Sequence, residues 1–168
     1  MTLSMYQASV PVLARMFNNL AAILTKAEAD AAARKIEPSV FIAARLAPDM
    51  YPFSRQIQIA SDAAKGGVAR LAGIEPPAFP DTETTFAELQ ERIRKTVDFV
   101  QSVTAAQIDG SEEKTITLKF PGREVTFPGQ VFLLNFTLPN VFFHITTAYD
   151  ILRHNGVALG KMDFLGGV

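Results

Sequence analysis

The chain contains no cysteine, and its charges nearly cancel, with 16 basic and 17 acidic residues among 168. The lack of cysteine excludes disulfide frameworks, thiolate zinc sites, iron–sulfur clusters and cysteine nucleophiles, and it makes the cytoplasm the expected location. The net charge of -1 provides no basic surface for nucleic acid or for an acidic membrane. We therefore expect no nucleic-acid partner and no membrane partner.

Long hydrophobic runs and common catalytic motifs are also missing. The longest apolar stretch, residues 131–145, contains Asn135, Asn140 and His144 and is shorter than the roughly 20 residues of a membrane span. No Gly-x-Ser-x-Gly elbow and no phosphate-binding loop occur, which disfavours these types of hydrolase and nucleotide site. Hydrophobic residues make up 48% of the chain, so we expect residues 1–168 to form a single domain around one core.

Hydrophobic periodicity predicts an all-α fold built on four helices. In the first helix, apolar residues recur every three or four positions, at Leu3, Tyr6, Val10, Leu13, Phe17, Leu20, Leu24 and Ala27. Pro11 within this stripe predicts a kink, or a helix start delayed to about Ser9. Residues 29–51 are expected to form a packed connection with a short helical turn. The second helix should begin at Pro52 and end at Gly73.

The middle of the chain predicts a crossover, a third helix and a hairpin. Residues 75–84 contain three prolines and should form a long extended connection between helices two and three. Thr85 and Glu88 match a capping box that opens the third helix, and from Lys114 the apolar period changes to two around a Pro121-Gly122 turn. We therefore expect a small β-hairpin before helix four.

The fourth helix is expected to run from Pro128 or Gly129 to about His154, with Asn155-Gly156 as a left-handed cap and a bend at Pro139. It is apolar on nearly every side, which predicts contact with more than one neighbour. We interpret part of this surface as a homodimer contact.

The motif LPNVFFHITTAYDILRHNGV at residues 138–157 resembles an uncharacterised bacterial family, domain of unknown function 1993, with the DinB/YfiT-like four-helix fold. Residues 159–165, LGKMDFL, are similar to the ending of that family. The resemblance implies a DinB-like bundle with a long crossover between helices two and three and a hairpin before helix four.

The wider DinB-like superfamily implies a divalent metal bound by one histidine of the second helix and a His-x-x-x-His pair of the fourth. His144 matches the first member of the pair, but Ala148 stands four residues later and the second helix has no histidine. His154 lies ten helical residues away, about 15 Å along the axis. Asp62 and Asp150 are the candidate carboxylates for a rebuilt site. We expect no metal and no other cofactor.

Three polar residues, Asn140, His144 and Thr147, share a strip of the otherwise apolar fourth helix. One interpretation makes the strip the wall of a small-molecule pocket, with Gln56 or Tyr6 opposite. The other makes it a buried hydrogen-bond network that fixes the packing of the helices.

Three functions remain open at this point. The first is a cytoplasmic, dimeric DinB-like protein that binds a small molecule near His144. The second is a degenerate metal-dependent hydrolase or thiol transferase with His144 as a ligand. The third is a structural interaction protein whose core is filled by side chains.

Overall fold

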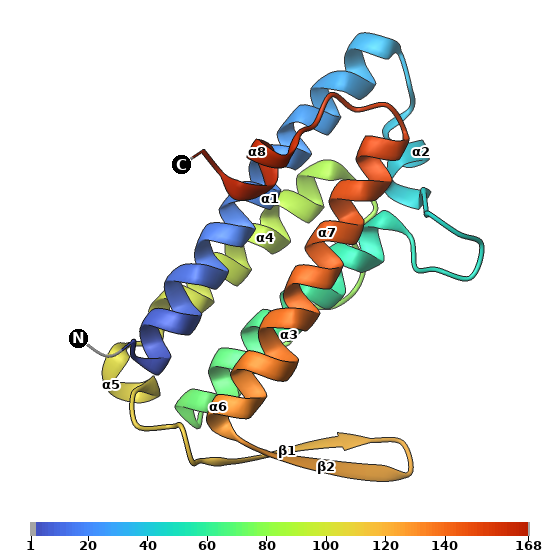
Figure 1. Cartoon of the computed structure of the whole chain (residues 1–168). Coiled ribbons are helices and arrows are strands. Elements are labelled where there is room, and N and C mark those ends of the chain that lie inside the picture. The colour runs from blue at the N-terminus through green and yellow to red at the C-terminus, as the bar shows by residue number, and fades with distance from the viewer. Residues whose placement is uncertain (1–2, 168) are drawn as a thin grey trace.

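The computed structural model describes residues 3–167, in which four long helical rods stand side by side with a hairpin across one end (Figure 1). The bundle helices are α1 (Met5–Arg34), α3 (Phe53–Ala72), α4 (Phe86–Ser102) and α7 (Leu138–His154). Short helices α2 (Pro38–Ala43) and α5 (Ala105–Ile108) stand near the ends of the bundle, and α8 (Lys161–Leu165) lies against the side of α1. The predicted all-α fold with one small hairpin is confirmed.

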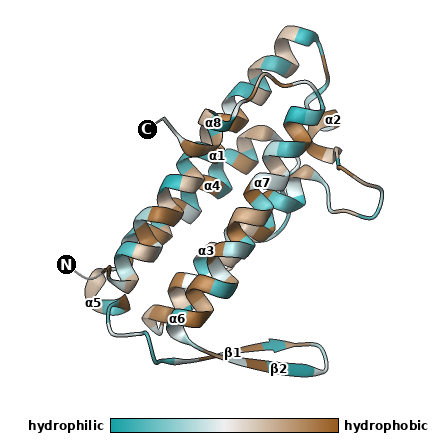
Figure 2. Ribbon diagram, in the orientation of Figure 1, coloured by the Kyte–Doolittle hydropathy of each residue, from teal (hydrophilic) through white to brown (hydrophobic). Residues whose placement is uncertain are grey.

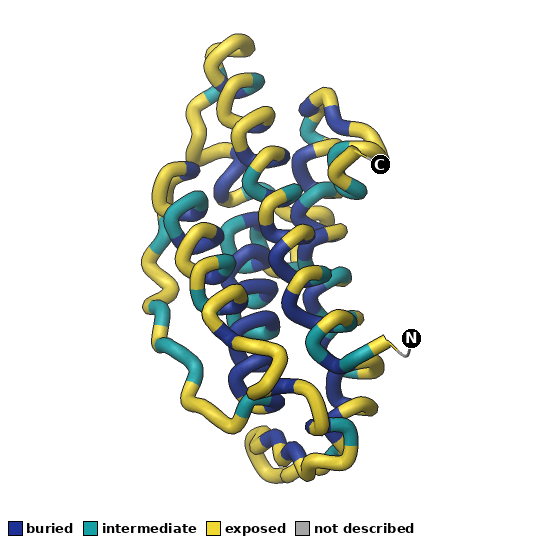
Figure 3. The backbone as a smooth tube through the Cα atoms, turned by 90° about the vertical axis from the view of Figure 1, so that its left-hand side faces the viewer, coloured by how far each residue is buried: buried dark blue, intermediate teal, exposed yellow. Residues whose placement is uncertain are grey.

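The core lies along the line where the four rods meet. Helix α3 packs on α7 and α4, while α1 packs on α4 and α7. Figure 2 shows brown apolar segments alternating with teal polar ones along each rod, and Figure 3 shows the buried residues on the sides that face the neighbouring helices. Buried apolar side chains from all four helices join in one cluster that includes Phe17, Leu20, Phe53, Ile57, Leu89 and Ile145. The helical periods of the sequence therefore mark the core correctly.

Helix α1 begins earlier than Pro11 suggests. The Ser4 hydroxyl accepts the N–H of Gln7, and the Gln7 side chain accepts the N–H of Ser4, so a capping box fixes the start at Met5. Pro11 lies inside the helix, so the alternative of a helix start delayed to about Ser9 is wrong. Leu3 precedes the cap and is 71% exposed, so it does not belong to the core stripe.

The second bundle helix, α3, starts and stops as expected to within one residue. Pro52 is the N-cap rather than the first helical residue, and Gly73 ends the helix with a left-handed φ of 74°. At Gly67 the helix meets the start of α7 closely, because a Cβ atom there would lie 2.3 Å from Cγ2 of Thr137. The small residue at position 67 of α3 therefore allows the two helices to pack closely.

The extended crossover between α3 and α4 is held by one arginine. The capping box of Thr85 and Glu88 opens α4 as predicted. Two turns later, the side chain of Arg92 is 1% exposed, and its guanidinium lies 2.9 Å from Asp62, 3.1 Å from Asp81 and 3.0 Å from Glu83. Asp62 belongs to α3, whereas Asp81 and Glu83 belong to the crossover. One buried cation therefore joins three segments of the chain.

The hairpin pairs β1 (Thr115–Phe120) with β2 (Arg123–Pro128) in antiparallel register around the expected Pro121-Gly122 turn. The fourth rod then runs from α6 (Gly129–Phe132) through a π-helical turn, η1 (Leu133–Thr137), into α7. The turn before Pro139 is widened, and the N–H of Leu138 donates to the carbonyl of Leu133 five residues back. Pro139 has no N–H to donate to the carbonyl four residues back, so the π-helical turn lies directly before it.

Short α8 closes the other end of the chain against α1. The amide of Asn19 donates to the carbonyl of Phe164 at 2.9 Å, and Lys26 pairs with Asp163 at 2.5 Å. Two helical stretches, Met5–Arg34 and Gly129–His154, are long and apolar enough to cross a membrane by length and composition. The core helices of a soluble bundle meet the same criterion, and 56% of the apolar window of the first stretch is buried here.

The Arg92 cluster gives a stability prediction. Replacing Arg92 by methionine keeps an unbranched apolar stem but leaves three carboxylates without their shared cation. We expect the free energy of unfolding to fall by about 2–3 kcal/mol, less than for a fully buried pair because Asp62 and Asp81 stay partly hydrated. Arg94→Met, which removes an exposed cation from the same helix, should lower the free energy of unfolding far less. Urea unfolding followed by circular dichroism measures both, and equal losses would contradict the role of Arg92.

Candidate functional site

His144 and Gln56 face each other across the contact between α7 and α3. Nδ1 of His144 lies 2.7 Å from Oε1 of Gln56, and the Gln56 amide nitrogen donates to the carbonyl of Tyr51 at 2.9 Å. Gln56 is 2% exposed, while His144 is only partly buried. The structure therefore unites two of the five residues predicted for the site, in a chain of hydrogen bonds that ends on a backbone carbonyl.

This chain of bonds fixes the proton on the imidazole. The Tyr51 carbonyl can only accept, so the Gln56 amide must present its nitrogen to Tyr51 and its oxygen to His144. The amide oxygen can only accept as well, so Nδ1 of His144 must carry the hydrogen. Within residues 3–167, Nε2 of His144 has no hydrogen-bond partner. In the neutral ring, this atom is therefore a free acceptor.

The surroundings keep the imidazole neutral. Burial lowers the pKa of His144 below its ordinary value of 6.5, and the nearby positive charge of Arg55 lowers this pKa further. Arg55 is one residue before Gln56 and pairs with Asp81 of the crossover. At neutral pH the site thus presents a ring nitrogen that can accept a hydrogen bond or a proton.

The other predicted site residues lie elsewhere. The Thr147 hydroxyl donates to the carbonyl of Phe143 in its own helix, at 2.8 Å. Asn140 faces a groove one turn toward the hairpin. Tyr6 is in the first turn of α1, where its N–H donates to Asp109, whereas Gln56 is in the first turn of α3 near the opposite end of the bundle (Figure 1). Tyr6 therefore does not face His144.

The residues around His144 do not fit the three-histidine metal site of DinB-like proteins. The α3 side chain facing the imidazole is the amide of Gln56, and Ala148 supplies no donor one turn along α7. Asp62 is bound instead to Arg92 and Lys65, each at 2.9 Å, and Asp150 is exposed. Among the residues that the structure describes, no three His, Cys, Asp or Glu side chains gather closely enough to hold a metal.

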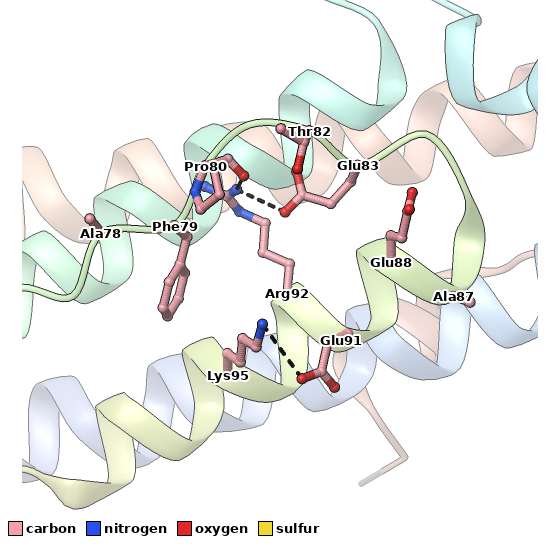
Figure 4. A pocket seen from close by; sticks show the side chains of 10 residues that line it. All are labelled: Ala78, Phe79, Pro80, Thr82, Glu83, Ala87, Glu88, Glu91, Arg92 and Lys95. Carbon is pink, nitrogen blue, oxygen red and sulfur yellow. Dashed lines mark hydrogen bonds and ion pairs between the residues drawn. The ribbon is translucent and has the colours of Figure 1, made fainter.

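A second hollow lies between the crossover and α4, with a volume of about 560 Å³. Figure 4 shows Arg92 rising from α4 to the crossover through its middle, with the ring of Phe79 to one side. The ring centroid of Phe79 lies 5.1 Å from the Lys65 ammonium and 5.9 Å from the Arg92 guanidinium. The charged side chains that line the hollow mostly pair with one another, as Arg92 does with Glu83 and Lys95 with Glu91. The hollow therefore forms where Arg92 holds the crossover against α4.

Sequence reasoning overlooked the Arg92 cluster. A usable signal existed, because Arg92 stands three residues after Leu89 and next to Ile93, on the apolar face of the third helix. A charged residue in that position must bring its own counterions into the core. Its partners lie in other segments, with Asp62 in α3 and Asp81 and Glu83 in the irregular crossover, so the helical pattern alone could not identify them.

Comparison with known proteins places the chain in context. A family profile described as domain of unknown function (DUF1993) matches residues 5–165. The crystal structure of a DinB family member protein from Shewanella denitrificans is 42% identical and superposes with a TM-score of 0.87, covering 97% of this chain and 92% of that one. No functionally curated protein matches the sequence.

The depressed pKa of His144 predicts a pH-dependent stability. Because the unfolded histidine takes up its proton at a higher pH than the folded one, the free energy of unfolding should fall as the pH falls through 6.5. His144→Gln should remove this part of the pH dependence, and His154→Gln, which changes an exposed histidine of the same helix, should retain it. Thermal unfolding between about pH 7.5 and about pH 5.5 provides the measurement. An unchanged slope in His144→Gln would refute the assignment.

Proposed function

Because the chain belongs to the DUF1993 family and has a DinB-like fold, we propose that it is a cytoplasmic helical-bundle protein that binds a small molecule beside His144 without a metal ion. The lack of cysteine supports the location. The observation that carries the proposal is the orientation of His144, whose Nδ1 is held by Gln56 while Nε2 has no partner within residues 3–167.

The free ring nitrogen determines what kind of ligand fits. A neutral imidazole with its lone pair on Nε2 accepts a hydrogen bond, so the ligand should carry an N–H or O–H group at this point. Gln56 and the Tyr51 carbonyl hold the ring in place before the ligand arrives, which lowers the entropic cost of binding. The edge of Phe143 lies against the same ring, with centroids 5.2 Å apart, and adds an apolar contact surface.

A metal-dependent hydrolase or thiol transferase is the rival function. It requires further ligands beside His144, and the α3 carboxylate considered from the sequence, Asp62, is already paired with two cations. Bringing Asp62 to His144 would leave the buried Arg92 with one carboxylate fewer, at a cost in stability. The hydrogen bond between Gln56 and His144 therefore supports ligand binding over metal chemistry.

Protein labelled with ¹⁵N in its two histidines tests the proposal. We expect zinc and nickel not to bind in stoichiometric amounts, and we expect compounds with an N–H or O–H group, taken from a fragment library, to shift the Nε2 signal of His144 but not that of His154. His144→Ala should lose the response to such compounds. Stoichiometric metal that disappears in His144→Ala would instead support the metal-dependent enzyme, and a library without any effect on His144 would refute the binding site.

Homodimer formation is the second part of the proposal. No charged residue occurs between Glu124 and Asp150, although part of that stretch is solvent-facing, and Leu134 and Phe143 are 46% and 58% exposed. The cores of protein interfaces are depleted in charge and rich in aromatic residues. In a twofold-symmetric dimer, the same surface of each copy meets at the interface. A surface without charged residues therefore avoids repulsion between like charges. These features support a second copy of the chain on the outer side of α7.

A single added charge on α7 tests the dimer. We expect light scattering at micromolar concentration to give about twice the 18.3 kDa of one chain. Thr146→Glu adds a carboxylate to the exposed side of α7 without removing core packing, and it should shift the protein to the monomer. Gln101→Glu adds the same charge to the exposed side of α4 and should leave the dimer intact. A wild-type protein of 18.3 kDa would contradict the proposal.

A further inference from the structure

A groove under the hairpin is lined by a residue whose buried hydroxyl has no hydrogen-bond partner among the residues that the structure describes. The groove has a volume of about 260 Å³ and lies between α3, the first strand of the hairpin and the π-helical turn. Its walls are mainly apolar and aromatic, and include Ile59, Leu118, Phe120, Phe132 and Phe136. Neither His144 nor Gln56 lines it, so it is separate from the site proposed above.

Thr137 is the unusual residue of this groove. It is 1% exposed, and its hydroxyl has no hydrogen-bond partner among the residues that the structure describes. Buried hydroxyls are normally paired, because an unpaired one costs about 1–3 kcal/mol. The hydroxyls of Thr25, Thr96 and Thr147, which are also helical, each donate to the carbonyl four residues back.

The π-helical turn explains why Thr137 differs. The carbonyl four residues before it belongs to Leu133, and that carbonyl accepts the N–H of Leu138 across the widened turn. π-helical turns of this kind occur often at functional sites, where they reposition a side chain. Here the turn places the Thr137 side chain against Gly67, beside the groove.

Of the three charged side chains at the rim of the groove, Asp62 and Lys119 have partners of opposite charge, whereas Arg70 donates to a backbone carbonyl and keeps its positive charge. Asp62 is bound by Arg92 and Lys65, and Arg70 donates to the carbonyl of Gly66 at 2.9 Å. Lys119, on the hairpin, lies 3.5 Å from Glu124. A ligand therefore meets mainly apolar and aromatic walls, with the Thr137 hydroxyl, the Asn140 amide and the Arg70 guanidinium as polar groups, and this combination fits a largely apolar molecule that has a hydrogen-bonding group.

We propose that the groove binds a small neutral aromatic compound with one hydroxyl group, a simple phenol, whose ring packs on Phe132 and Phe136 and whose hydroxyl pairs with Thr137. The volume is just below the range of about 300–1,000 Å³ for drug-sized ligands and suits a single ring. The rings of Phe132 and Phe136 stack with centroids 5.8 Å apart, and both line the groove, where Phe136 is partly exposed and Phe132 is buried. The threonine hydroxyl is buried beside Gly67 in the free protein, so pairing with the ligand requires this side chain to rotate about χ1.

The experiment compares p-cresol with toluene, which has the same ring and methyl group but no hydroxyl. In ¹H–¹⁵N spectra of the wild-type protein, p-cresol should shift the amide signals of Gly67, Thr137 and Asn140 and bind more tightly than toluene. Thr137→Val keeps the shape of the side chain and removes the hydroxyl, and it should weaken p-cresol about two- to ten-fold, to the affinity of toluene.

Two variants serve as controls. Thr147→Val removes a buried hydroxyl from the same helix that is already paired, and it should leave p-cresol binding unchanged. His144→Gln should also leave it unchanged, which separates this groove from the proposed site at His144. Absence of p-cresol shifts in this groove, equal affinity for p-cresol and toluene, or an undiminished affinity in Thr137→Val would overturn the proposal.

Discussion

The buried guanidinium of Arg92 is the interaction on which the arrangement of the bundle depends. The crossover between α3 and α4 has no regular secondary structure of its own, so its path is set by the groups that bind it. Asp81 and Glu83 approach Arg92 from the crossover, and Asp62 approaches from α3. Burying a charge is costly unless it is paired on several sides, and this requirement excludes other paths for the crossover. The cluster therefore contributes more to the choice of one arrangement than to net stability.

Its influence extends toward the candidate site through α3. Asp81, a partner of Arg92, also binds Arg55, which stands next to Gln56 and lowers the pKa of His144. Farther along α3, Asp62 lies on the rim of the groove under the hairpin. The α3–α7 contact therefore has a polar pair near one end and a small aromatic groove nearer the hairpin, both next to residues that the cluster fixes. A DinB-like frame that lacks the usual histidines still places two chemically distinct features along one helix pair.

The fold could be predicted from the sequence in most respects, because it depends on local rules. The apolar stripes, the Thr85 capping box, the period-two hairpin and the stop at Gly73 all act over a few residues. The start of α1 was misplaced because Pro11 is conspicuous, whereas the Ser4 and Gln7 capping box is not. The π-helical turn could not be predicted, since it depends on how α7 meets Gly67 of α3 as well as on Pro139.

The candidate site was predicted only in part, because it depends on contacts between helices rather than on local rules. His144 was found because a lone imidazole on an apolar helix requires a partner, and Gln56 proved to be that partner. The position of Tyr6 was predicted wrongly. Apolar periodicity indicates which side of a helix faces the core, but not which residues of two helices lie at the same level along the bundle. Thr137 was missed altogether, since a threonine in a helix normally pairs with its own backbone.

The docking of α8 on α1 has a consequence for how the chain folds. The bonds of Arg15 with Leu165 and of Asn19 with Phe164 connect residues 150 and 145 positions apart, among the most distant contacts in the sequence. Such contacts stabilise the chain only after the intervening segment has been brought together, because loop-closure entropy must be overcome first. We therefore expect α8 to dock late in folding and to detach early from the native state. In such a local opening, the C-terminal end would separate from α1 while the four long helices stay assembled.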